Sequence, residues 1–146
     1  MNLIVDAGVV FFANFFNLLI AGIMIARVYG LKLLERNLGW LAVGLGLPFA
    51  LALVYNLASG RPWWAWVLPL IFLLHTGIEF ILDYWLKAPF RQTRWLGPYL
   101  GLFYLAQWGL IGYAFLVTER AGFTTLVTYF LSLAATAFSY ARVRHG

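Results

Sequence analysis

Apolar residues dominate five long stretches of the chain, and short segments rich in turn-forming and charged residues separate them. The apolar stretches cover residues 6–28, 38–57, 63–86, 95–117 and 122–141. Each is close to the roughly 20 residues that an α-helix needs to cross the hydrocarbon core of a bilayer. The pattern predicts an all-α membrane protein, a compact bundle of five transmembrane helices that forms a single integral membrane domain over residues 1–146.

The composition points to the same class of protein. Hydrophobic residues make up 64% of the chain and charged residues only 10%, with a mean hydropathy of +0.86, whereas soluble domains carry about 25% charged residues. There is no cysteine, which excludes disulfides, thiolate metal sites and thiol redox chemistry. The N-terminus lacks the basic region of a cleavable signal peptide, so we expect the first helix to be retained.

Basic residues are distributed unequally between the two sides of the predicted bundle. Only Arg61 and Arg120 fall on one side, and the other eight basic residues fall on the other: Arg27, Lys32, Arg36, Lys87, Arg91, Arg94, Arg142 and Arg144. By the positive-inside rule, this asymmetry predicts a multipass protein of a prokaryotic cytoplasmic membrane, with the N-terminus outside and the C-terminus in the cytoplasm. It also accounts for the net charge of +5, so nucleic acid is not an expected partner.

Three ionisable residues follow one another at helical spacing in the third apolar stretch. His75, Glu79 and Asp83 occur at successive i, i+4 positions and therefore lie along one stripe of a helix. Counted from Trp63 at about 1.5 Å per residue, His75 lies about 18 Å into the helix, near the middle of a bilayer. A carboxylate at such depth costs at least about 2.5–3.5 kcal/mol and usually faces protein or water. This stripe is the main candidate for a ligand-binding or proton-binding centre.

Other polar residues of the apolar stretches have a structural interpretation beside the functional one. Asn14, Asn17 and Gln107 reach the central depth on the first and fourth helices; they could orient a ligand, or join helices through hydrogen bonds worth about 0.6–2 kcal/mol each. Pro48 and Pro69 lie inside apolar stretches and free backbone carbonyls, which predicts kinks. For Asp83 the structural alternative is an ion pair with one of three basic residues: Arg27, Arg91 or Arg94.

Two short segments resemble segments of known families. The segment Arg61–Trp64, with Trp66 and Pro69, is similar to part of the tryptophan-rich sensory proteins, but that family carries its proline and tryptophan pattern after the first span. The pair His75-x-x-x-Glu79 is similar to the proton-handling pair of the emopamil-binding sterol isomerases, whose further acidic and basic motifs are missing here. The resemblances imply only that such a bundle can hold a lipophilic ligand.

Three functions fit this sequence. The first is a small membrane protein whose polar centre on the third helix binds or moves a lipophilic or small ligand, or protons. The second is a non-catalytic subunit or assembly factor that packs against other membrane proteins or against its own copies. The third is an acid–base enzyme acting on a lipid through His75 and Glu79; a non-enzymatic role is favoured. We expect membrane lipids as partners and no cofactor or metal, because one buried histidine with His145 in the tail is a poor zinc ligand set.

Overall fold

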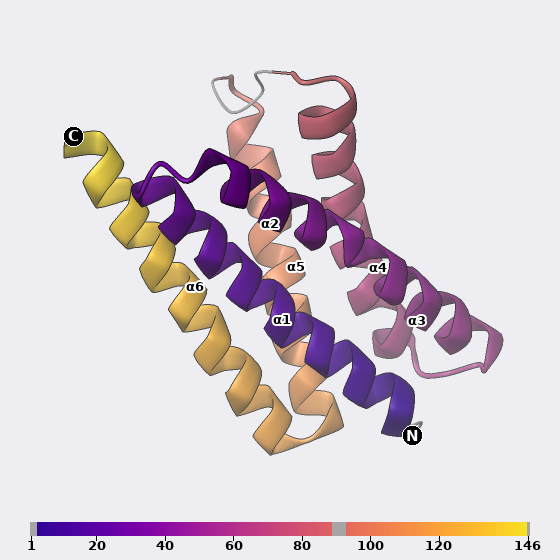
Figure 1. Ribbon diagram of the computed structural model, residues 1–146. Coiled ribbons are helices and arrows are strands. Elements are labelled where there is room, and N and C mark those ends of the chain that lie inside the picture. Colours follow the sequence, from indigo (N-terminus) through magenta and orange to yellow (C-terminus); the bar gives the residue numbers. More distant parts are fainter. Residues whose placement is uncertain (1–2, 89–92, 146) are drawn as a thin grey trace.

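The computed structural model describes residues 3–88 and 93–145, which form helices and short connections without a β-strand (Figure 1). Five helices in this part of the chain are long and apolar enough to cross a membrane: Leu3–Val28, Lys32–Ala58, Trp63–Trp85, Leu96–Val117 and Glu119–Arg142. The prediction of five long apolar helices is therefore confirmed.

Two of the five long helices are composite. The second consists of α2 (Lys32–Gly44) and α3 (Gly46–Ala58), and the third of α4 (Trp63–Glu79) and a π-helical segment, η1 (Phe80–Trp85). The remaining three are continuous: α1 (Leu3–Val28), α5 (Leu96–Val117) and α6 (Glu119–His145).

The break between α2 and α3 follows from Pro48. Proline has no N–H, so it cannot donate the helical hydrogen bond to the carbonyl four residues earlier, at Gly44. Leu45, between the two helices, still has helical backbone angles, with φ −63° and ψ −14°. The sequence predicted a kink at Pro48. The structure has a local break there, and the long helix continues past it to Ala58.

The second long helix begins earlier than the hydropathy pattern predicted. The apolar stretch begins only at residue 38, and the charged residues before it were expected to belong to a connection, yet α2 begins at Lys32. The Nη2 atom of Arg27, in the last turn of α1, donates a hydrogen bond of 2.7 Å to Oε1 of Glu35. This ion pair joins the two helices across their connection and stabilises the charged first turn of α2.

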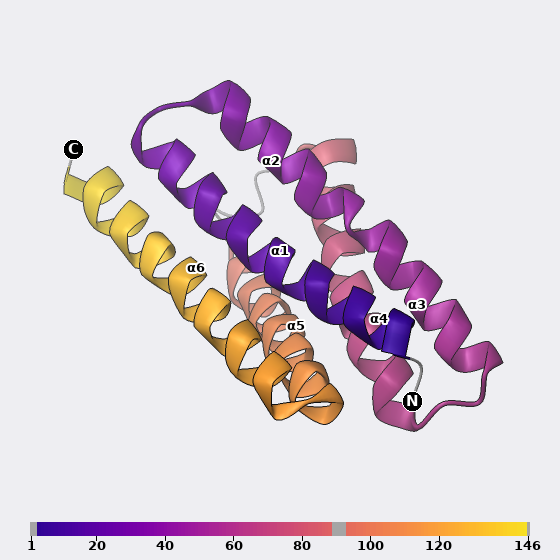
Figure 2. The same cartoon turned by 60° about the horizontal axis from the view of Figure 1, so that its bottom comes forward.

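The helices form a closed circuit of neighbours, in the order α6, α1, α2–α3, α4, α5 and back to α6 (Figures 1 and 2). One end of the bundle carries the N-terminus and the α3–α4 and α5–α6 connections; we call it the N-terminal end. The other carries the C-terminus, the α1–α2 connection, η1 and the start of α5; we call it the C-terminal end. Because α3 packs along α4 but α2 meets α4 at few points, the circuit is looser at the C-terminal end.

Three fully buried aromatic rings form the centre of the core. Phe72 of α4 lies between Phe16 of α1 and Phe49 of α3, with ring centroids 4.9 Å and 4.2 Å apart. None of the three is more than 1% exposed. Within a membrane such close packing, rather than removal of apolar surface from water, holds helices together.

Candidate functional site

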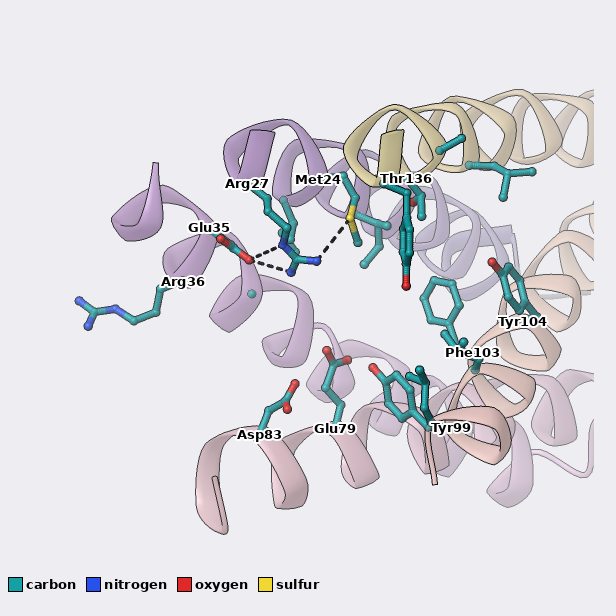
Figure 3. Close-up of a pocket in the computed structure, with 18 of the residues that line it drawn as sticks. Met24, Arg27, Glu35, Arg36, Glu79, Asp83, Tyr99, Phe103, Tyr104 and Thr136 are labelled. Carbon is teal, nitrogen blue, oxygen red and sulfur yellow. Dashed lines mark hydrogen bonds and ion pairs between the residues drawn. The ribbon is translucent and has the colours of Figure 1, made fainter. Parts of the chain in front are cut away.

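A cavity of about 890 Å³ lies between the helices at the C-terminal end of the bundle (Figure 3). Residues of α1, α2, α4, η1, α5 and α6 line it. On α1 the lining extends from Arg27 down to Ile20, a depth of about 10 Å at about 1.5 Å per residue. The volume falls within the range of about 300–1,000 Å³ that is typical of small-molecule sites.

The deeper part of the cavity is largely apolar. Aliphatic and aromatic side chains from three helices form this part, which we call the apolar body: Ile20, Ile23, Met24, Leu100, Phe103, Leu133 and Ala137. Tyrosines add ring faces and hydroxyl groups to the walls: Tyr84, Tyr99, Tyr104 and Tyr140. The walls therefore suit a mainly apolar ligand with some polar groups.

Charged residues gather at one end of the cavity, and we call this end the mouth. Glu79 at the end of α4 and Asp83 in η1 form one side, and Arg27, Glu35 and residues at the start of α2 form the other. In Figure 3 the carboxylates of Glu79 and Asp83 point across the cavity towards the Arg27–Glu35 ion pair, whereas Arg36 extends away from them. Among the described residues, no group of three or more His, Asp or Glu side chains is arranged to hold a metal ion.

The ion pair of Arg27 differs from the sequence interpretation. The sequence offered Arg27, Arg91 and Arg94 as partners of Asp83, but Arg27 binds Glu35 through Nε and Nη2 at 2.9 Å and 2.7 Å. Because α2 begins at Lys32, Glu35 lies in the first turn of α2, within reach of Arg27 in the last turn of α1. Arg91 lies outside the described residues.

His75 lies behind the wall of the cavity rather than in it. Its side chain is 1% exposed, and its Nε2 atom lies 3.9 Å from Oε2 of Glu79, as the i, i+4 spacing predicted. Its ring packs against Tyr99 and Phe103 of α5, with centroids 5.4 Å and 5.2 Å away. These two aromatic residues line the cavity, so of the predicted stripe only Glu79 and Asp83 reach the cavity directly.

The segment that carries Asp83 is a π-helix, which the hydropathy pattern did not predict. Here the N–H of Leu86 donates to the carbonyl of Ile81, five residues earlier, at 2.8 Å. Such segments are rare and occur often at functional sites. Apolar periodicity does not distinguish an i→i+5 from an i→i+4 turn, so the sequence carried no usable signal for it.

A glycine allows η1 to approach α2 closely. The hydroxyl oxygen of Tyr84 lies 2.5 Å from the position that a Cβ atom would take at Gly39. The ring of Tyr84 also packs on Trp40, with centroids 4.3 Å apart. The absence of a side chain at Gly39 therefore helps to fix the wall of the cavity.

Asn14 and Asn17 join α1 to α6, away from the cavity lining. Asn14 donates to Oγ1 of Thr125 at 3.0 Å and accepts a hydrogen bond of 2.8 Å from the Thr128 hydroxyl. Asn17 donates to Oγ1 of Thr128 at 3.0 Å. The structure thus links both residues to α6, where they share Thr128 as a partner, and neither lines the cavity.

Gln107 is the remaining residue that the sequence singled out. It is 1% exposed on α5, and its amide oxygen and nitrogen make no hydrogen bond within the described part of the protein. It lies about one turn beyond Phe103, away from the mouth, and is not among the residues that line the cavity. No hydrogen bond of its side chain connects it to His75, Glu79 or Asp83.

A deeply buried ion pair at the N-terminal end was missed from the sequence. Asp6 of α1 is 0% exposed and accepts hydrogen bonds from Nη1 and Nη2 of Arg61 at 2.8 Å and 3.0 Å. The hydroxyl of Tyr113 on α5 donates to the same carboxylate at 2.7 Å. The hydrogen bonds to Asp6 raise the pKa of the Arg61 guanidinium above its ordinary value, against the opposite effect of burial.

The same network extends to the backbone of α4. Nη1 of Arg61 also donates to Oδ1 of Asn56 at 2.9 Å, and Nδ2 of Asn56 donates to the carbonyl of Ala65. Pro69 has no N–H to donate to the carbonyl four residues earlier, so the Asn56 side chain supplies the missing donor. The carbonyl that Pro69 frees, together with Asp6 at the start of an apolar stretch, is a sequence signal from which a polar network here could have been inferred.

Comparison of the chain with protein-family models, curated proteins and solved structures gave no match. The function of this protein is therefore inferred from the geometry and the chemistry of the cavity and from the distribution of charge.

Proposed function

We propose that this chain is a multipass membrane protein whose cavity binds an amphipathic ligand. The observation that carries the proposal is the cavity itself, which has about 890 Å³ of space, an apolar body and a charged mouth at one end of five apolar helices. A cavity with mostly apolar walls and a few polar groups is the usual form of a small-molecule site.

The depth of the lining residues supports an amphipathic rather than a uniformly apolar ligand. Arg27 lies in the last turn of α1, and Lys32 and Glu35 lie in the first turn of α2. In helices that cross a bilayer these positions lie near the headgroups, because charges at greater depth are costly. The apolar body continues about 10 Å further towards the hydrocarbon, so the polar end of the ligand would lie at the mouth and its apolar part inside.

The balance of charge supports an orientation for the bundle. Among the residues that the structure describes, seven basic and three acidic residues belong to the C-terminal end, a balance of +4, whereas the N-terminal end has two of each. We infer from the positive-inside rule that the C-terminal end, with the cavity mouth, faces the cytoplasm of a prokaryotic cell.

We favour binding over acid–base chemistry because of the position of His75. A general acid or base must come within hydrogen-bond reach of the group that it protonates or deprotonates. His75 is 1% exposed and lies behind the rings of Tyr99 and Phe103. A ligand in the cavity would meet Glu79 but not His75.

Filling the apolar body tests the proposal. The variant Leu100→Trp/Ala137→Trp places two large side chains on facing helices within the lining. The matched control Leu105→Trp/Ala134→Trp makes the same substitutions on α5 and α6 at exposed positions outside the lining.

Binding of dodecylamine, dodecanol and dodecanoate to protein in a mild detergent would be followed by native mass spectrometry. We expect at least one probe to bind the wild type and the control about equally, and to bind the cavity variant at least about tenfold more weakly. Equal binding to all three proteins, or no binding to any, contradicts a ligand-binding cavity. A stoichiometric second polypeptide in the spectra would instead favour the subunit hypothesis.

A further inference from the structure

The acidic residues of the C-terminal end are concentrated at the cavity mouth, whereas the other charged residues of that end are basic. The chain has three acidic residues at the C-terminal end, Glu35, Glu79 and Asp83, and all three line the cavity. Of the basic residues that the structure describes at this end, Lys87, Arg94 and Arg142 do not line it. The mouth is thus more acidic than the surface around it.

Three basic residues line the mouth, and each lies differently relative to the carboxylates of Glu79 and Asp83. Arg27 is bound by Glu35 through two hydrogen bonds, and Arg36 extends away from the two carboxylates in Figure 3. Lys32, the first residue of α2, remains at the rim. A ligand head between the two walls would therefore meet the carboxylates of Glu79 and Asp83 on one side. On the other side it would meet Arg27 within its ion pair with Glu35, and Lys32 at the rim.

The aromatic residues of the wall add to this preference for positive charge. Ring faces attract cations within about 6 Å, by about 0.5–2 kcal/mol depending on solvation. Tyr84 lies next to Asp83 in the chain, and Tyr99 and Phe103 face the cavity from α5. His75 touches Glu79 from the buried side, while 20% of the Glu79 side chain stays exposed.

We propose that the cavity selects amphipathic ligands with a cationic amine head, which Glu79 and Asp83 bind at the mouth while the apolar body takes the tail. This inference rests on the proposed function and names the chemical class of the ligand. The amine could belong to the headgroup of a membrane lipid or to a free amphiphile, since both present the same chemistry to the mouth.

The test compares three probes of equal chain length that differ only in the charge of the head. We expect wild-type protein to bind dodecylamine at least about tenfold more tightly than dodecanoate, with dodecanol between them, because a tenfold ratio corresponds to one modest charge interaction. The near-isosteric variant Glu79→Gln/Asp83→Asn should lose this preference. Glu119→Gln, an exposed acidic residue at the other end, is the matched control and should keep it.

The outcomes separate this proposal from the preceding one. Binding that the tryptophan pair blocks, but that ranks the three probes equally or favours dodecanoate, overturns the amine head and leaves the cavity standing. Binding that the tryptophan pair does not affect overturns both. The order of the three affinities for wild-type protein tests the preference for an amine head even if the Gln/Asn variant does not fold.

Competition identifies the source of the amine. Phosphatidylethanolamine or phosphatidylglycerol is added to the protein–dodecylamine complex at equal mole fraction in the micelle. Displacement by phosphatidylethanolamine alone assigns the headgroup of a membrane lipid. Retention of dodecylamine with both lipids assigns a free amphiphile, and displacement by phosphatidylglycerol alone contradicts the preference for a cation.

Discussion

The buried ion pair of Asp6 and Arg61 should hold the N-terminal end of the bundle together, and a double-mutant cycle can measure its contribution. The cycle compares Asp6→Ala, Arg61→Ala and the double variant with the wild type. The Asp6 carboxylate is 0% exposed and accepts two hydrogen bonds from Arg61 and one from Tyr113. Each single substitution therefore leaves a buried charged group without its principal partner.

The two single substitutions should differ in cost. Removal of one partner of a buried ion pair costs about 3–5 kcal/mol, because the remaining charge is uncompensated. Arg61 keeps 10% of its side chain exposed and can turn towards water, so we expect Asp6→Ala to cost about 3 kcal/mol. Arg61→Ala leaves the fully buried carboxylate behind and should cost about 5 kcal/mol. The double variant should cost about 2–3 kcal/mol less than the sum of the two.

Reversible unfolding in mixtures of mild detergent and dodecyl sulfate would give these free energies, with the seven tryptophans as the fluorescent probe. Arg120→Ala is the control, since Arg120 is an exposed arginine of the same end; its cost should stay within about 0.5 kcal/mol of zero. Tyr113→Phe removes one hydrogen bond to a charged group and should cost about 1.5 kcal/mol. If the costs of Asp6→Ala and Arg61→Ala simply add, the two residues do not act as a pair and the reasoning is wrong.

Two further predictions concern the orientation of the bundle and the approach of η1 to α2. Because the chain has no cysteine, a single cysteine at Ser59 or at Thr93 can be labelled in intact cells with a membrane-impermeant maleimide. We expect Ser59→Cys to react before lysis and Thr93→Cys only after it, and the reverse order would invert the topology. A Cβ atom at Gly44 would meet open space, so Gly44→Ala should raise the free energy of unfolding by up to about 1 kcal/mol. A Cβ atom at Gly39 would meet the Tyr84 hydroxyl, so Gly39→Ala should not give this gain. Adding Tyr84→Phe should restore it, and equal effects of the two alanines would contradict the contact.

The number of long helices was predictable because the bilayer imposes a strong requirement on sequence. A span needs about 20 consecutive apolar residues, so the hydropathy pattern located all five. It failed at Lys32, where the helix begins in a charged segment. Hydropathy does not register charges that lie at a helix end and pair with a neighbour, as Glu35 does with Arg27.

The candidate site was predictable only as far as it is local. Spacing along one helix placed His75 beside Glu79, and it placed Glu79 and Asp83 on one side of the third span. The cavity itself depends on the divergence of α2 from α4, which no single helix encodes. For the same reason the partners of Asp6 were not found, since Arg61 lies 55 residues away in the chain.

The Asp6–Arg61 network at the N-terminal end and the charged mouth of the cavity at the C-terminal end can be compared directly. At the N-terminal end Arg61 binds Asp6 of α1 and Asn56 of α3, and the Tyr113 hydroxyl of α5 binds the same Asp6 carboxylate. At the C-terminal end α2 has separated from α4, and Glu79 and Asp83 face a cavity that no single side chain fills. A cationic head at the mouth would stand in the same relation to these carboxylates as Arg61 does to Asp6. On this view, a bound ligand completes at one end the packing that the protein's own arginine completes at the other, and binding should therefore protect the C-terminal end from local opening more than the N-terminal end.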